Sequence, residues 1–232
     1  MNFLILILLL CLFISLYVLY LLSHDDFVIL RRDAPMEKIF NSAFIFTISA
    51  ILTSRLLYVL LNPSNLFHSL LGFLLFPYFP GLSIIGGIIG GFGISYIYLN
   101  SKNLPVGRIM DFFSMSFLVS YPIGIIGYLV LLGGKIYYSW YILLFLSAIV
   151  LLVFVRFILK AALGGKLKDG SLTLIFLASF SVIFISTDLL RSLGQKTFDP
   201  EEILGFILLI FSLITLVKYE NLHKFILKNV RH

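Results

Sequence analysis

Two arginines, a tyrosine and an aspartate lie in or at the ends of long apolar runs, where such side chains are rare. Arg55 and Tyr58 are three residues apart in the second run, and Asp188 and Arg191 are three apart at the end of the sixth. This spacing places each pair on one face of a helix. Ionisable groups in apolar helices are costly and usually indicate a functional site. Since arginine fits phosphate bidentately and a carboxylate can orient it, these residues indicate a site for an anionic headgroup.

The elements that position these side chains are indicated by composition. Of the 232 residues, 60% are hydrophobic and 12% are charged, and the mean hydropathy is +1.09. A soluble domain carries about 25% charged residues, so this pattern predicts a polytopic membrane protein. The single cysteine, Cys11, lies in an apolar run, which excludes a disulfide framework or a cysteine metal site. We expect neither a metal nor a cofactor.

We expect an all-α protein with seven transmembrane helices that forms a single transmembrane domain over residues 1–232. The apolar runs cover residues 2–22, 41–62, 82–100, 111–132, 139–159, 171–190 and 203–218. Each is near the roughly 17–25 residues that cross a bilayer. An apolar, proline-containing arm at 66–80 is expected at the membrane interface. Asp111 is expected to open the fourth span, because an acidic side chain suits a helix N-terminus.

The basic residues predict the orientation. The loops after the first, third and fifth spans and the C-terminal tail hold 13 of the 17 lysines and arginines, and the opposite loops hold 3. Positive charge marks the cytoplasmic side, so we expect the N-terminus outside and the C-terminus in the cytoplasm. This asymmetry explains the net charge of +6 without a nucleic-acid partner. In this orientation Arg55, Tyr58, Ser83, Asp188 and Arg191 all lie in the outer half of the membrane.

A purely structural interpretation of the same residues stays open. Arg55 and Asp188 could form an ion pair that only joins two helices, or the arginine could extend to the interface. Residues 81–91 (GLSIIGGIIGG) contain glycines four residues apart, the spacing that lets helix backbones approach closely. Packing alone is therefore an alternative to a binding site for this stretch.

The order of three segments resembles the bacterial prolipoprotein diacylglyceryl transferase family. The segments are SRLLYVLLN (54–62), GLSIIGGIIGG (81–91) and DFFSMSFLVSYPIGIIGYL (111–129). Family members typically show A-R-L-x-Y-V-x-x-N, then G-x-S-F-H-G-G-L-x-G, then D-F-x-x-P followed by G-R-x-G-N. Residues 29–40, 168–192 and 198–211 are also similar to family segments, so the resemblance covers nearly the whole chain. The family's seven spans and outside N-terminus agree with the topology expected here.

The resemblance implies a function and a set of partners. Family members transfer the diacylglyceryl group of phosphatidylglycerol to the lipobox cysteine of a prolipoprotein in the bacterial plasma membrane, and release glycerol phosphate. The implied partners are thus phosphatidylglycerol, prolipoprotein signal segments and membrane lipid. Asp188 stands where the family has glutamate, and Arg191 where it has a basic residue. The lipid-headgroup-binding residues implied in this way are Arg55, Tyr58, Ser83, Gly86, Gly87, Gly127, Asp188 and Arg191.

Several motif positions differ from the family. Ile85 stands at the histidine, Ile125 at the arginine, Tyr128 at the asparagine, and Phe184 at another arginine of the sixth span. Thioether formation needs a proton acceptor and cations that stabilise developing charge, which isoleucine and phenylalanine cannot supply. Catalytic residues are therefore left unassigned, and whether the chain is an enzyme stays open. The alternative is a non-catalytic phospholipid- or lipoprotein-binding membrane protein on the same fold.

Overall fold

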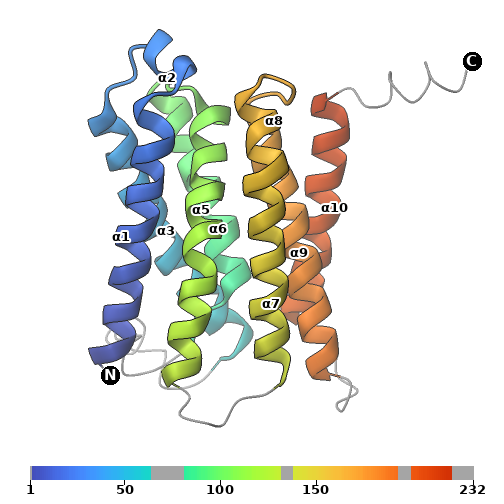
Figure 1. Ribbon diagram of the computed structural model, residues 1–232. Helices are drawn as coiled ribbons and strands as arrows, with labels where there is room; N and C mark the ends of the chain where they lie inside the picture. The colour runs from blue at the N-terminus through green and yellow to red at the C-terminus, as the bar shows by residue number, and fades with distance from the viewer. Residues whose placement is uncertain (1, 64–80, 132–137, 193–199, 221–232) are drawn as a thin grey trace, which may run out of the picture. The chain divides into compact units, whose positions relative to one another are not determined.

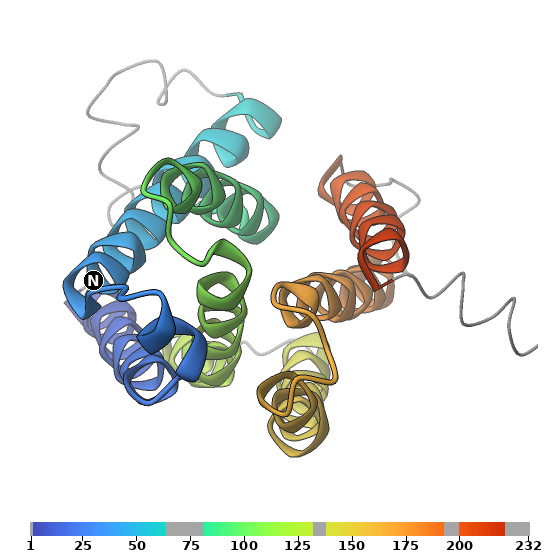
Figure 2. The same cartoon turned by 90° about the horizontal axis from the view of Figure 1, so that it is seen from above.

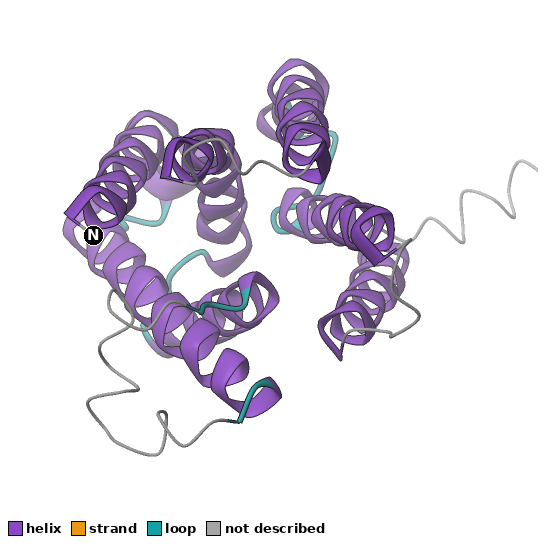
Figure 3. Cartoon of the chain, turned by 90° about the horizontal axis from the view of Figure 1, so that it is seen from below, coloured by secondary structure: helices purple, strands orange, loops and turns teal. Residues whose placement is uncertain are grey.

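A computed structural model describes residues 2–63, 81–131, 138–192 and 200–220 (Figure 1). Every regular element in these ranges is a helix, and none of the described residues is in a strand (Figure 3). The all-α fold class is thereby confirmed. The chain divides into two compact units, Met1–Gly134 and Lys135–His232, and each is described by itself. The predicted interfacial arm at 66–80 lies outside the described residues.

Seven helices of the described chain are long and apolar enough to cross a membrane, as predicted. Unit 1 holds four, and unit 2 holds three, the first of them composed of consecutive helical segments. Their bounds are α1 Asn2–His24, α3 Met36–Leu61, α5 Ile84–Ser101, α6 Val106–Leu131, then α7 Tyr138–Val153 with η2 Phe154–Ile158 and α8 Leu159–Leu163, α9 Ser171–Ser192 and α10 Pro200–Glu220.

Two of these helices, α3 and α6, begin five residues earlier than hydropathy predicts. Helix α3 begins at Met36, directly after Pro35, and α6 begins at Val106, directly after Pro105. Proline favours the start of a helix because its φ angle is already helical and it has no N–H to leave unpaired. The expectation that Asp111 opens its span is therefore wrong. Asp111 lies in the second turn of α6, where it is buried.

Unit 1 is built from two closely packed helix pairs. Helix α3 packs along α5, and α1 packs along α6 (Figure 2). Aromatic contacts link the pairs: the ring of Phe46 on α3 lies 5.1 Å from that of Phe92 on α5 and 5.4 Å from that of Phe113 on α6, measured between centroids. Such contacts stabilise helix packing in a bilayer, where apolar burial alone gives little driving force.

A short helix, α2 (Phe27–Arg31), connects α1 to α3 and is held by a buried ion pair. One carboxylate oxygen of Asp26 accepts from the backbone N–H groups of Val28 (3.0 Å) and Ile29 (3.1 Å) and so caps the helix. The other accepts from Nε (3.0 Å) and Nη2 (2.6 Å) of Arg108 on α6. Both charged side chains are buried. The connection is therefore fastened to the start of α6.

In unit 2, α9 lies between the α7 run and α10 (Figure 2). A row of phenylalanines follows one side of α9: Phe176 lies 6.0 Å from Phe180, and Phe180 lies 6.4 Å from Phe184. Phe154, in the π-helical turn η2, meets Phe176 edge-on at 6.5 Å. These rings form an apolar seam inside the unit.

The start of α9 is joined to the end of α10 by hydrogen bonds. Glu220 accepts from the backbone N–H of Lys168 (2.9 Å) and from the hydroxyl of Ser171. The Lys168 ammonium donates to the carbonyl oxygen of Tyr219 at 2.7 Å. The carboxylate thus satisfies donors at the start of α9, as a helix cap does.

Candidate functional site

The candidate site lies at the end of unit 1 where α3 ends and α5 begins. Arg55 is six residues before Leu61, the last residue of α3, which corresponds to about 9 Å along the axis. Its side chain is only 2% exposed, so it is turned into the protein and not toward acyl chains. Nη1 donates a hydrogen bond to the carbonyl oxygen of Gly81 at 2.7 Å. The arginine therefore joins α3 to the segment that precedes α5.

Tyr58 and Gly81 complete this contact. The guanidinium carbon of Arg55 lies 5.8 Å from the centroid of the Tyr58 ring, within the range of a cation–π interaction. Gly81 has a φ angle of +148°, which other residues rarely adopt, and a Cβ added there would overlap the Tyr58 ring. The position thus requires glycine for two reasons. Sequence reasoning did not select Gly81, although it is the first residue of the glycine-rich stretch.

Ser83 ends the segment and begins the helix. Its hydroxyl oxygen accepts from the backbone N–H of Gly86 at 3.2 Å, so Ser83 is the N-cap of α5. Its own N–H donates to the carbonyl oxygen of Ser54 on α3 at 3.1 Å. The N-terminus of α5 is thereby fixed beside Arg55. A helix N-terminus favours anions, so the cap and the arginine contribute positive potential at the same place.

The glycines of α5 allow it to lie directly against α3. A Cβ on Gly86 would lie 2.7 Å from Cβ of Leu57 and 3.0 Å from the carbonyl oxygen of Thr53. A Cβ on Gly87 would lie 3.3 Å from the carbonyl oxygen of Ala50. Close backbone approach is therefore the role that the structure gives to both glycines. Their predicted contact with a lipid headgroup stays a prediction.

Gly127 occupies a different contact of unit 1. A Cβ on this residue of α6 would lie 2.6 Å from Cγ2 of Ile7 on α1. The structure thus brings Arg55, Tyr58, Ser83 and the two α5 glycines together between α3 and α5, and places Gly127 in the packing of α1 against α6.

Three of the four replaced motif positions hold apolar side chains, and the two isoleucines among them are buried. Ile85, at the family's histidine position, is fully buried with 0% exposure, and Ile125, at the arginine position, is 5% exposed. Tyr128, at the asparagine position, is 40% exposed on α6. Phe184 belongs to the phenylalanine seam of unit 2. The two isoleucines therefore contribute to the core of unit 1.

The remaining predicted site residues belong to unit 2. Asp188 lies near the end of α9 and is partly exposed. Arg191 is in the last turn of the same helix, and its side chain lies outside the described part. The expected meeting of Asp188 with Arg55 joins two units that are described separately, so it stays a prediction.

Comparison with known proteins gives one match. A family model described as prolipoprotein diacylglyceryl transferase matches residues 5–137, which is more than half of the chain. The matched region runs from α1 to the end of α6 and contains the whole Arg55 site, whereas Asp188 and Arg191 lie beyond it. Neither a curated protein nor a solved structure matches the chain.

Proposed function

Because this chain belongs to the prolipoprotein diacylglyceryl transferase family, we propose that it binds phosphatidylglycerol at the Arg55 end of unit 1 and transfers its diacylglyceryl group to a prolipoprotein cysteine. Family membership supports lipid and prolipoprotein substrates in general, and the seven apolar helices support a multi-pass membrane protein. The finer assignments are ours: phosphatidylglycerol as the lipid, the bacterial plasma membrane as the location, and the outer leaflet as the side.

The observation that carries the proposal is that a buried arginine near the end of α3 lies beside the N-terminus of α5. Arg55 is 2% exposed, yet it lies within hydrogen-bonding distance of the backbone that leads into α5. Ionisable side chains within membrane-spanning helices are rare and usually mark functional sites. The guanidinium and the helix N-terminus together form a positive environment that suits a phosphodiester. A phospholipid headgroup brings that group to this depth of the bilayer.

The chemistry of transfer can be written for this site. The cysteine sulfur forms a bond to the terminal glycerol carbon of the diacylglyceryl group. The bond between that carbon and the phosphodiester oxygen breaks, and its electron pair leaves with glycerol phosphate. A cation beside the phosphate stabilises the charge that develops on the leaving group, which is the role we assign to Arg55.

The thiol proton needs an acceptor, and Ile85 cannot provide one. A free thiol has a pKa near 8.5, so about a few per cent is already thiolate at neutral pH, and thiolate is the nucleophilic form. We propose that the proton passes to water at the membrane surface before attack. Transfer in this protein would then depend on leaving-group stabilisation and positioning, without a histidine base.

One observation favours a second function. Both residues at the family's histidine and arginine positions are buried in the apolar core of unit 1, Ile85 completely. This arrangement supports a non-catalytic protein that binds phosphatidylglycerol or a prolipoprotein signal segment on the same fold. Such a protein uses Arg55 for recognition and needs no proton acceptor.

A modification assay separates the two functions. The purified chain in detergent is incubated with phosphatidylglycerol and a lipobox peptide, and mass spectrometry follows the peptide and the release of glycerol phosphate. The transferase predicts both products in equal amounts, and their loss in Arg55→Ala but not in Arg156→Ala, which changes an exposed arginine of unit 2. Without product, thermal protection by phosphatidylglycerol that Arg55→Ala removes supports the binding protein. Without product or lipid-specific protection, both functions are wrong.

A further inference from the structure

Helix α2 exposes large apolar side chains beyond the end of a transmembrane helix. Phe27 is 75% exposed and Leu30 is 59% exposed, whereas Ile29 between them is buried. Phe27 and Leu30 are three residues apart and therefore share one face of the helix. On a spanning helix such exposure is expected, because lipid tails cover it. In a connecting segment, neighbouring exposed apolar side chains that form one patch indicate an interaction surface.

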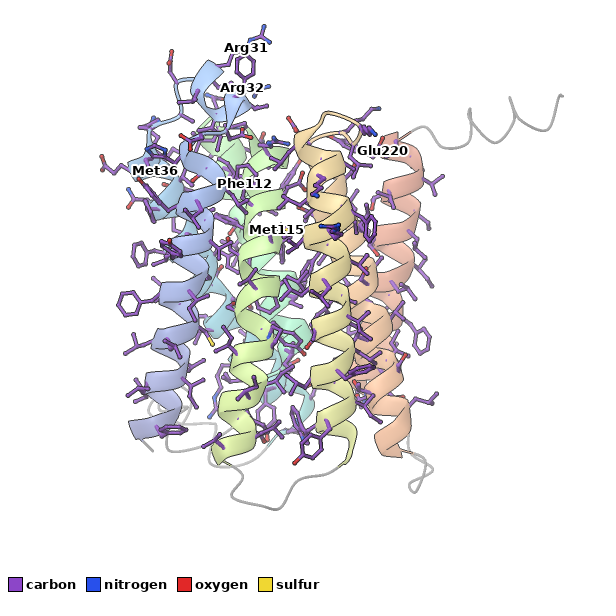
Figure 4. All side chains as sticks on the ribbon, viewed as in Figure 1. Arg31, Arg32, Met36, Phe112, Met115 and Glu220 are labelled. Carbon is purple, nitrogen blue, oxygen red and sulfur yellow. The ribbon has the colours of Figure 1, made fainter. Side chains whose placement is uncertain are left out.

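Two arginines border this apolar face. Arg31 ends α2 and Arg32 is its C-cap, and both side chains are exposed. Figure 4 shows them at the same end of unit 1, beyond Met36 and Phe112. Within the described chain neither guanidinium takes part in an ion pair or a side-chain hydrogen bond. In contrast, Asp26 and Arg108, which lie just behind the helix, pair with each other.

The arginines and the apolar side chains line one hollow. An open hollow of about 420 Å³ is bordered by Phe27, Val28, Arg31 and Arg32. None of the three carboxylates that flank α2 in sequence is part of this lining: Asp25 pairs with His24 at 2.7 Å, Asp26 is held by Arg108, and Asp33 follows Arg32 as an exposed side chain. The lining is therefore cationic and apolar.

The position of α2 relative to α1 places this surface at a bilayer boundary. Helix α1 has 23 residues, and its length of about 35 Å exceeds the hydrocarbon core of about 30 Å. Helix α2 begins three residues after α1 ends, so the chain can rise at most about 10 Å further. That distance corresponds to the headgroup region, because a bilayer with headgroups is about 40–45 Å thick.

We propose that α2 is a docking surface for anionic phospholipid of the leaflet at which α1 ends. Phe27 and Leu30 insert at the boundary between headgroups and acyl chains, and Arg31 and Arg32 bind the phosphates. Apolar side chains buried at the headgroup boundary, beside basic side chains that attract anionic lipid, are the two contributions by which interfacial helices bind membranes. The Asp26–Arg108 pair holds the surface in place from behind. By charge asymmetry this is the cytoplasmic leaflet, opposite the Arg55 site, so the proposal does not depend on the proposed function.

A lipid titration tests the arginines. The full chain in detergent is titrated with phosphatidylserine, with phosphatidylcholine as reference, and native mass spectrometry counts the retained lipid. Each basic residue near an anionic surface contributes about fivefold in affinity, so Arg31→Gln with Arg32→Gln should weaken phosphatidylserine binding by about 25-fold. The matched control, Lys38→Gln with Lys102→Gln, removes the same charge from exposed positions at the same end of the unit. It should change the affinity less than twofold.

The outcomes of this titration are distinct. Equal losses in both double variants would mean a diffuse attraction to the whole end of the protein, and no loss in the α2 variant would remove the arginines from the site; either result overturns the proposal. The Arg55→Ala variant should retain phosphatidylserine at α2. If it loses this lipid, the bound molecule sits at the other site and the α2 surface is wrong.

A second measurement tests the insertion of Phe27 without relying on affinity. The chain has one tryptophan, so Trp140→Phe combined with Phe27→Trp places the only indole on α2. In phosphatidylserine–phosphatidylcholine vesicles with lipids brominated on the upper acyl chain, we expect strong quenching of its fluorescence. An indole that aqueous iodide quenches and brominated lipid does not would overturn the docking surface.

Discussion

Arg55 and Gly81 are joined by a hydrogen bond of 2.7 Å between the guanidinium Nη1 and the glycine carbonyl oxygen. The bond closes the segment before α5 onto α3 and turns a buried cation toward the helix N-terminus. Gly81 tolerates this position because its φ angle of +148° suits glycine and because Tyr58 occupies the space where a Cβ would lie. One arginine thus both positions the backbone of the site and supplies its charge.

We expect Arg55→Ala to lower thermal stability and to remove specific protection by phosphatidylglycerol. The change leaves the carbonyl of Gly81 without this donor, and hydrogen bonds to charged groups contribute about 1.5–3 kcal/mol. Arg55→Lys should keep part of the protection, because it retains the charge but not the planar fork. Thermal unfolding in detergent with and without the lipid measures both effects. Equal protection by phosphatidylcholine in the native chain would contradict a headgroup site.

Gly86→Ala should destabilise unit 1 by about 1–3 kcal/mol, the usual cost of overpacking. The added Cβ would lie 2.7 Å from Cβ of Leu57 and 3.0 Å from the carbonyl oxygen of Thr53, so α5 would have to move away from α3. Gly93→Ala on the same helix is the matched control, because outside its chain neighbours and the backbone of its own helix no atom lies within 4 Å of the added Cβ. It should be neutral or stabilise by up to about 1 kcal/mol, since alanine favours helix. Similar unfolding temperatures for the two variants would refute the close approach.

Asp26→Asn should destabilise the fold by about 3–5 kcal/mol, because it removes the carboxylate charge that pairs with the buried Arg108 guanidinium. The amide can still cap α2, so the loss reports the ion pair more than the cap. Asp25→Asn next to it changes a 90% exposed carboxylate and should leave stability nearly unchanged. Chemical or thermal unfolding of the three proteins side by side checks this prediction. A loss confined to Asp25→Asn would be incompatible with the structure.

If the protein transfers diacylglyceryl groups without a base of its own, its rate should follow ionisation of the substrate thiol. The thiolate fraction rises with pH up to a thiol pKa near 8.5, so the initial rate should increase by about tenfold for each unit between pH 6 and pH 8 and level off above pH 9. The assay with lipobox peptide measures this at saturating lipid. A rate that is already constant at pH 7 would indicate a base within the protein.

Hydropathy alone predicted the seven helices, because crossing a bilayer requires a local run of apolar residues that any window of the sequence displays. Charge counts predicted an orientation, because the basic residues of each loop can be counted directly from the sequence. Two helix starts were misplaced, and with them the role of Asp111, because Pro35 and Pro105 begin helices in polar sequence that hydropathy does not register. The glycine spacing predicted that another helix lies close against α5, but it did not predict that this helix is α3.

The tertiary structure decided which residues each of these side chains contacts. Arg55 bonds to a carbonyl 26 residues away, and Arg108 pairs with an aspartate 82 residues away, so neither contact is a property of any local segment. Ser83 caps α5, and its expected contact with a lipid headgroup stays a prediction. The sequence therefore determined which segments cross the membrane, since that depends on sums over neighbouring residues. Which side chains meet depended on the packing of α3 against α5 and on the approach of Asp26, the N-cap of α2, to Arg108 on α6. Only the folded chain brings such distant residues within hydrogen-bonding distance.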